Sequence, residues 1–202
     1  MQTMKDKVLA RIERLDAGKA FSAKDFLDIA SRGSIDMALS TLTRTNQIRR
    51  VRRGLYDRPK ISAVLGGMLS PDIDEAARAI ARKQRWKIAP EGAWAANLLG
   101  LSTQVPAKIS YLIDGPSKNI PIGRRIIHFR HARPKVIAGL DGKSALVVQA
   151  LRYLGKDAVG EREIQRLRIS LSPSEKRSLL KDTRFGVDWI YAAAKQIAEQ
   201  AS

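Results

Sequence analysis

The sequence predicts an α+β fold with two domains. Apolar residues recur at helical spacing near both ends of the chain, whereas short alternating runs bounded by glycine and proline lie at 47–57 and 105–131. The 202 residues, 44% of them hydrophobic, are enough for one or two folded cores. We expect a cytoplasmic protein, because the sequence shows neither a signal peptide nor an apolar run near the roughly 20 residues of a membrane-spanning helix.

The first 30 residues predict two helices. Apolar residues at every third or fourth position indicate an amphipathic helix that Gly18 ends, and they are Met4, Val8, Ile12 and Leu15. Ser22 and Asp25 have the spacing of a capping box, and Phe21 and Phe26 have that of a hydrophobic staple. A second helix is therefore expected from about Ala23 to Ala30.

A third helix is expected after a short turn that contains Gly33. Ser34 is its predicted N-cap, and the helix is expected to run from Ile35 to about Thr45. One face is apolar, with Ile35, Ala38, Leu39 and Leu42, and the opposite face is polar. Two helices joined by a short glycine-containing turn are typical of a helix-turn-helix.

A two-stranded hairpin is expected directly after this helix. Residues 47–52 alternate between apolar and basic, Arg53 and Gly54 indicate a turn, and residues 55–57 form the return strand. Ile48 and Val51 are an odd number of residues apart, so both can face the core only if the strand carries a bulge near Arg50. Such a hairpin is the wing of a winged helix-turn-helix domain, which we place at residues 1–62.

The wing is rich in arginine, which indicates binding to DNA. We expect the helix 35–45 to lie in the major groove, with Arg32 near a phosphate. Base edges would be read by Ser34, Asp36, Met37, Ser40, Thr41 and Arg44. The wing would contact DNA through Arg49, Arg50, Arg52, Arg53 and Tyr56. The alternative is a winged helix that serves only protein contacts.

The second domain, residues 68–202, is expected to combine a small antiparallel sheet with a C-terminal helical bundle. Strand patterns lie at 86–89 and 105–113, and a hairpin around Gly123 joins strands at 119–122 and 125–131. Apolar stripes predict helices at 143–154, 161–169 and 187–197, and a capping box at Ser172 opens another.

Two aspartates, Asp72 and Asp74, have the spacing of the paired metal-binding aspartates of nucleotidyltransferases. In that motif a Gly-Ser pair comes first, whereas Gly66 and Gly67 precede the aspartates here. Acidic residues at a helix start also complement the helix dipole. We therefore expect both to serve the start of a helix.

The net charge of +17 is concentrated in two zones. Residues 1–60 carry a net +7, and residues 118–135 carry a net +6 without any acidic residue, which favours a nucleic acid as partner. The second zone contains Lys118, Arg124, Arg125, Arg130, Arg133 and Lys135. It is either a second surface for nucleic acid or an acidic partner, or a solvated edge that discourages sheet aggregation.

The sequence gives no sign of catalysis. There is no cysteine, no P-loop and no dinucleotide-binding fingerprint, and His128 and His131 should point to opposite faces of one strand. We expect no metal, no cofactor and no enzymatic activity.

The chain resembles the AbiEi-family antitoxins of type IV toxin–antitoxin systems. The resemblance runs from about residue 5 to residue 190. It rests on the wing sequence Arg52–Tyr56 and on the runs at 95–107, 111–116 and 150–156. It implies a winged helix that binds inverted repeats in its own promoter, and a C-terminal domain that counters a toxin of the nucleotidyltransferase class, with or without a stable complex.

We therefore expect a DNA-binding antitoxin that represses its own operon. The alternative is a stand-alone winged-helix regulator whose C-terminal domain dimerises or senses a ligand. A third possibility, an enzyme acting on nucleic acid, requires a carboxylate cluster or a competent histidine, and the sequence offers neither.

Overall fold

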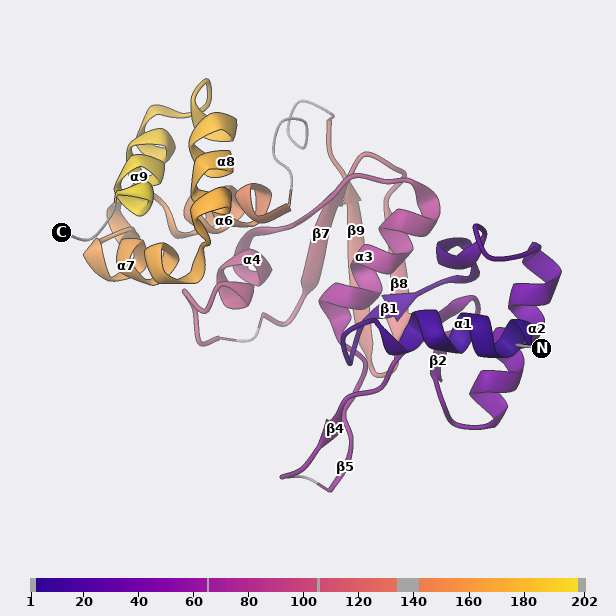
Figure 1. Cartoon of the computed structure of the whole chain (residues 1–202). Helices are drawn as coiled ribbons and strands as arrows, with labels where there is room; N and C mark the ends of the chain where they lie inside the picture. The colour runs from indigo at the N-terminus through magenta and orange to yellow at the C-terminus, as the bar shows by residue number, and fades with distance from the viewer. Residues whose placement is uncertain (1–2, 65, 105, 134–141, 200–202) are drawn as a thin grey trace. The chain divides into compact units, whose positions relative to one another are not determined.

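The computed structural model describes residues 3–64, 66–104, 106–133 and 142–199. The chain has an α+β fold, as the sequence predicted (Figure 1). It divides into two compact units. The first contains residues 1–86 and 120–127, and the second contains 87–119 and 128–202. This division differs from the expected boundary near residues 63–67, because the helix that follows it groups with the first unit.

The first unit begins with a helical module around a three-stranded sheet. Its helices are α1 (Met4–Glu13), the 3₁₀ helix η1 (Ala23–Phe26) and α2 (Arg32–Arg44). The strands β1 (Ala20–Phe21), β2 (Arg49–Arg52) and β3 (Leu55–Asp57) pair in the order β1-β3-β2. Buried side chains from all three helices form one core, among them Val8, Phe26, Leu39 and Leu42.

The capping box and the hydrophobic staple predicted the start of the second helix, η1, correctly, but they did not predict its length. The Ser22–Asp25 capping box is present, and the Phe21 and Phe26 rings pack edge to face at 5.4 Å. The prediction of an α-helix to Ala30 is wrong, since η1 ends at Phe26 and turns follow. Residues 27–30, between Phe26 and the Ser31 cap of the next helix, form turns and a bend instead.

The third helix starts earlier than predicted. Ser31, not Ser34, is its N-cap, and the Ser31 hydroxyl accepts a hydrogen bond from the Ser34 backbone N–H. Arg32, Gly33 and Ser34 therefore lie within α2. The predicted buried face is confirmed, since Ile35, Ala38, Leu39 and Leu42 are all buried.

The rest of the first unit consists of a short ribbon and a long helix. Strands β4 (Ile61–Ser62) and β5 (Gly67–Met68) pair antiparallel, and α3 (Ile73–Gln84) follows. Asp72 caps α3 by accepting a hydrogen bond from the Glu75 N–H at 3.1 Å, and Asp74 pairs with Arg78 one turn on. The capping interpretation of the two aspartates is thus confirmed.

The second sheet has four strands in the order β6-β7-β9-β8. They are β6 (Ile88–Pro90), β7 (Ile109–Ile113), β8 (Lys118–Ile122) and β9 (Arg125–His131). The β6–β7 pair is antiparallel. The Ala132 N–H donates to the Ile113 carbonyl at 2.8 Å, so β7 and β9 end side by side and run parallel. The sheet is therefore mixed rather than purely antiparallel.

Helices form the core of the second unit. They are α4 (Gly92–Leu98), α6 (Gly142–Leu154), η2 (Lys156–Ala158), α7 (Glu161–Ser170), α8 (Pro173–Thr183) and α9 (Asp188–Ala198). Residues 144–151 of α6 are all buried, so α6 is the central helix of this bundle. Trp94 of α4 donates a buried hydrogen bond to the Tyr111 hydroxyl on β7 at 2.7 Å, which ties the first of these helices to the sheet.

Candidate nucleic-acid interface

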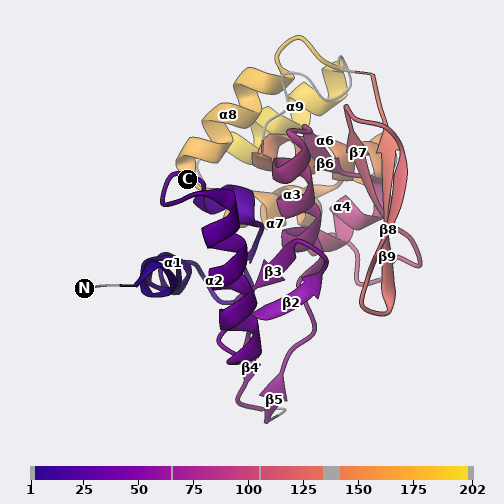
Figure 2. The same ribbon diagram turned by 90° about the vertical axis from the view of Figure 1, so that its right-hand side faces the viewer.

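The outer face of α2 carries the residues that were expected to read bases. Asp36, Met37, Ser40 and Arg44 are exposed, and Thr41 is half-buried. Met37 is 69% exposed. Figure 2 shows α2 along its length, with the β2–β3 hairpin beside it.

Arg32 and Asp36, two of the expected contact residues, bind each other. The Arg32 Nε lies 2.8 Å from an Asp36 carboxylate oxygen, and both side chains are about half exposed. An exposed pair one helical turn apart contributes only a few tenths of a kcal/mol. A phosphate could therefore replace Asp36 as the partner of Arg32 at little cost.

The wing is built as the sequence predicted, with a bulge. The pairing of β2 with β3 shifts register between Arg50 and Arg52, so Val51 is the extra residue. Gly54 adopts a φ of +72°, a left-handed conformation that suits glycine in the turn between the strands. Arg50 and Arg53 are exposed, and Arg52 is half-buried.

Arg49 and Tyr56 have partners within the fold. Arg49 pairs with the buried Asp57 through two hydrogen bonds, at 3.0 and 2.5 Å, and donates a third to the Leu69 carbonyl. The Tyr56 ring stacks on Phe21 at 6.4 Å. The wing arginines that are left for a ligand are therefore Arg50, Arg52 and Arg53.

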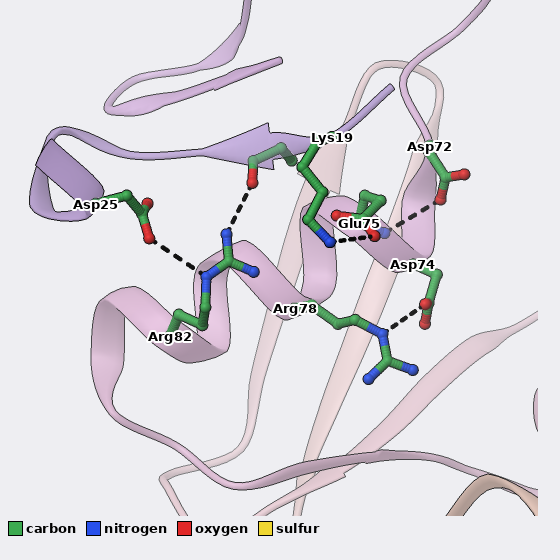
Figure 3. A network of polar contacts seen from close by, with 8 residues as sticks. Lys19, Asp25, Asp72, Asp74, Glu75, Arg78 and Arg82 are labelled. Carbon is green, nitrogen blue, oxygen red and sulfur yellow. Dashed lines mark hydrogen bonds and ion pairs between the residues drawn. The ribbon is translucent and has the colours of Figure 1, made fainter. Parts of the chain in front are cut away.

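A network of ion pairs holds α3 against the winged module (Figure 3). Lys19 lies 3.1 Å from Glu75. Arg82 donates to the Ala20 carbonyl on β1 at 2.8 Å and pairs with Asp25 of η1 at 3.3 Å. The network places the C-terminal end of α3 beside the wing.

Two lysines that the sequence had not singled out extend the basic surface there. Lys24 donates to the backbone carbonyl of Lys83 at 2.8 Å, and the Lys83 ammonium lies 3.5 Å from the carbonyl of Gly54 in the wing turn. Partial burial, followed by repulsion from Arg32, Arg52 and Lys24, lowers the pKa of Lys83, and Asp36 acts in the opposite direction. We call Lys24, Arg32, Arg52 and Lys83 the cation group.

The sequence alone could not reveal the cation group. Lys24 stands in the capping region of η1, and Lys83 lies on a helix that was assigned to the other domain. The available signal was the basic end of the α3 sequence, which contains Arg82 and Lys83. On its own, this basic end is typical of any helix C-terminus, where positive charge complements the helix dipole.

The second basic zone is divided by the fold. Arg124 and Arg125 are exposed at the tip of the β8–β9 hairpin, and residues 120–127 of this hairpin group with the first unit. Lys118 and Arg130 line a hollow in the second unit together with Lys108. Arg133 is exposed, and Lys135 lies outside the described residues. The described residues of this zone are thus divided between the two units.

The described residues show no sign of a metal site. Among them, no three histidine, aspartate or glutamate side chains converge to hold an ion. His128 contacts the Asn119 side chain at 2.9 Å, whereas His131 contacts the Gly115 carbonyl at 3.0 Å, so the two rings have different surroundings. In the same described segments, no helix has the length and apolar character needed to cross a membrane.

Comparison with known proteins gives a family without an assigned activity. A model of a family of unknown function, DUF6088, matches residues 7–179. The chain is similar to the crystal structure of the Rv2827c protein from Mycobacterium tuberculosis. The identity is 16%, the match covers 96% of this chain and 76% of that one, and the TM-score is 0.41. No curated protein matches the chain. The family model spans most of the sequence, and the chain therefore belongs to the DUF6088 family.

Proposed function

We propose that this protein is a DNA-binding antitoxin that represses its own toxin–antitoxin operon. The winged helix binds the operator, with α2 in the major groove and the wing arginines on the phosphate backbone. The C-terminal domain counters a toxin of the nucleotidyltransferase class. The resemblance to AbiEi-family antitoxins supports this proposal over most of the chain.

The cation group is the observation that carries the DNA-binding part. Its four side chains come from η1, α2, the wing and α3. Partial burial, followed by repulsion from the other three cations, lowers the pKa of Lys83. Asp36 acts on the pKa of Lys83 in the opposite direction, but it already pairs with Arg32. A DNA phosphate at this place would relieve the repulsion, because it brings further negative charge to four cations that have one carboxylate, Asp36, beside them.

The antitoxin part rests on segments that the fold brings together in the second unit. The resemblance includes residues 95–104, 111–116 and 150–156. In the structure these segments lie at the end of α4, on β7 and at the end of α6, and α4 packs closely on α6. The shared sequence therefore corresponds to the scaffold of the second unit rather than to scattered loops.

The direct test is a titration of the full chain with DNA from upstream of its own gene. Six to ten phosphate contacts would lower the affinity roughly 10³- to 10⁵-fold between 50 and 200 mM salt. We expect such a dependence, together with tighter binding to the upstream DNA than to a scrambled duplex. Weak binding that is insensitive to salt would contradict the proposal.

Antitoxicity is tested separately in cells. The full chain, co-expressed with the product of the neighbouring gene, should restore growth if that gene encodes a nucleotidyltransferase-type toxin. The variant Arg52→Gln/Arg53→Gln should restore growth equally well but no longer repress a reporter driven by the upstream DNA. Loss of both activities in this variant would argue against separate roles for the two parts of the chain.

A further inference from the structure

The outer face of the second sheet carries a cationic hollow that DNA binding by the winged helix does not use. Its volume is about 500 Å³, and every residue that lines it belongs to the second unit. It is lined by three cationic side chains, Lys108, Lys118 and Arg130, and by no acidic side chain. A volume of this size is typical of a small-molecule site.

Strand alternation explains why the cations gather there. On β9, Ile127 and Phe129 are buried, so His128 and Arg130 share the opposite face. On β7, Ile109 and Tyr111 are buried, so Ser110 lies on that same outer face, and Lys108 precedes it by two residues. β9 lies between β7 and β8 in the sheet, so these side chains converge with Lys118 of β8.

Two contacts fix the polar groups at the rim of the hollow. Glu91 forms an ion pair with Arg130, and this partner holds the guanidinium in place while 64% of the side chain stays exposed. Asn119 Oδ1 lies 2.9 Å from His128 Nδ1, a contact that orients the imidazole beside the hollow. Surface charge that serves only solubility is usually interspersed with the opposite sign and needs no such orientation.

From this arrangement we infer that the hollow binds the phosphate groups of a nucleotide, either a free nucleotide or one at the end of a nucleic acid. Phosphate oxygens accept several charge-assisted hydrogen bonds at once, and the hollow offers two ammonium groups, a guanidinium and the Ser110 hydroxyl. A concave site of this volume suits a compact polyanion better than the broad surface of an acidic protein.

Calorimetry with inorganic tripolyphosphate and with GTP tests the inference at physiological ionic strength. The variant Lys108→Gln/Lys118→Gln should weaken binding of both probes about tenfold or more. The control Lys156→Gln/Lys181→Gln removes the same charge from exposed sites of the second unit and should bind as the unaltered protein does. No binding by the unaltered protein, or equal weakening in both variants, would overturn the inference.

Proton NMR of the unaltered protein gives a second readout that does not depend on a variant folding. The chain has two histidines, and only His128 lines the hollow. Tripolyphosphate should shift the imidazole resonances of His128 and leave those of His131 in place, with the assignment made in His131→Gln. Absence of a shift at His128 counts against the site.

An RNA oligonucleotide with a 5′-triphosphate, compared with the same RNA ending in a 5′-hydroxyl, identifies the source of the phosphate. If the triphosphorylated RNA competes with tripolyphosphate for the hollow and GTP does not, the phosphate belongs to a nucleic-acid end. If GTP competes and the RNA does not, the ligand is a free nucleotide. Equal competition by both RNAs would show that the hollow responds to backbone charge and would overturn the inference. Arg52→Gln/Arg53→Gln should bind all these probes normally, because the wing is not part of the hollow.

Discussion

Arg49 and Arg50 are neighbours on β2, yet their side chains have different surroundings. Arg49 is bound to Asp57, whose side chain is 1% exposed, whereas Arg50 is exposed. Removing one partner of a buried ion pair leaves an uncompensated charge and costs about 3 kcal/mol. We expect Arg49→Gln to lower the free energy of unfolding by about that amount, as measured in guanidinium chloride. Arg50→Gln is the matched control and should change it by less than about 0.5 kcal/mol. Equal effects would show that the Arg49–Asp57 pair does not stabilise the wing.

Lys83 should show opposite effects on stability and on binding. Its pKa is lowered by partial burial and by three neighbouring cations, so the unfolded chain holds this proton more tightly than the folded chain. Between the lowered pKa and the ordinary value of 10.5, the free energy of unfolding therefore rises with pH. We expect Lys83→Gln to stabilise the free protein slightly in urea at neutral pH and to remove this dependence. The same variant should bind DNA more weakly, with a salt slope smaller by about one. Lys7→Gln, an exposed charge on α1, is the control for both measurements.

At the scale of the element, the N-cap of α2 distinguishes two serines that stand three residues apart. Ser31 accepts the hydrogen bond that caps the helix, and Ser34 is its donor through the backbone. Ser31→Ala should therefore cost about 1 kcal/mol in unfolding free energy. Ser34→Ala keeps the backbone donor and should cost clearly less. A larger loss of unfolding free energy in Ser34→Ala than in Ser31→Ala would indicate that Ser34, and not Ser31, caps α2.

Substitutions in the wing and in α2 should affect DNA binding in different ways. Arg52→Gln/Arg53→Gln should weaken binding to operator and scrambled DNA by similar factors and reduce the salt slope by about two. Ser40→Ala/Thr41→Ala should change the ratio between the two DNAs while leaving the slope nearly unaltered. Identical behaviour of the two double variants would contradict the separate roles of the wing and α2.

Patterns within a few residues of the sequence predicted the features that depend on neighbouring residues. The Phe21–Phe26 staple, the bulge between Arg50 and Arg52 and the cap at Asp72 all follow from residues a few positions apart. Other contacts depend on segments far apart in the sequence. They are the hydrogen bond from Arg49 to the Leu69 carbonyl, the place of Lys83 beside the wing turn and the parallel pairing of β7 with β9. No periodicity encodes such contacts, and the cation group was missed for that reason.

For the whole molecule, the two compact units determine which fragments of the chain could be used to assign repression and antitoxicity to separate parts. A fragment that begins at residue 68 would remove from α3 its ion pairs with Lys19 and Asp25 and the hydrogen bond that Arg82 donates to the Ala20 carbonyl. It would also expose Ala76, Ala77 and Ile80, which are buried in the full chain. Point variants of the full chain are therefore the better means of separating repression from antitoxicity.

The salt dependence of DNA binding by the full chain tests the central claim most directly. The chain is titrated with its own upstream DNA at several salt concentrations, and the logarithm of the binding constant is plotted against that of the salt concentration. We predict a slope of about −5 or steeper, which Arg52→Gln/Arg53→Gln reduces by about two. A slope near zero, or one that the wing variant leaves unaltered, would contradict a winged helix that binds DNA through its cations.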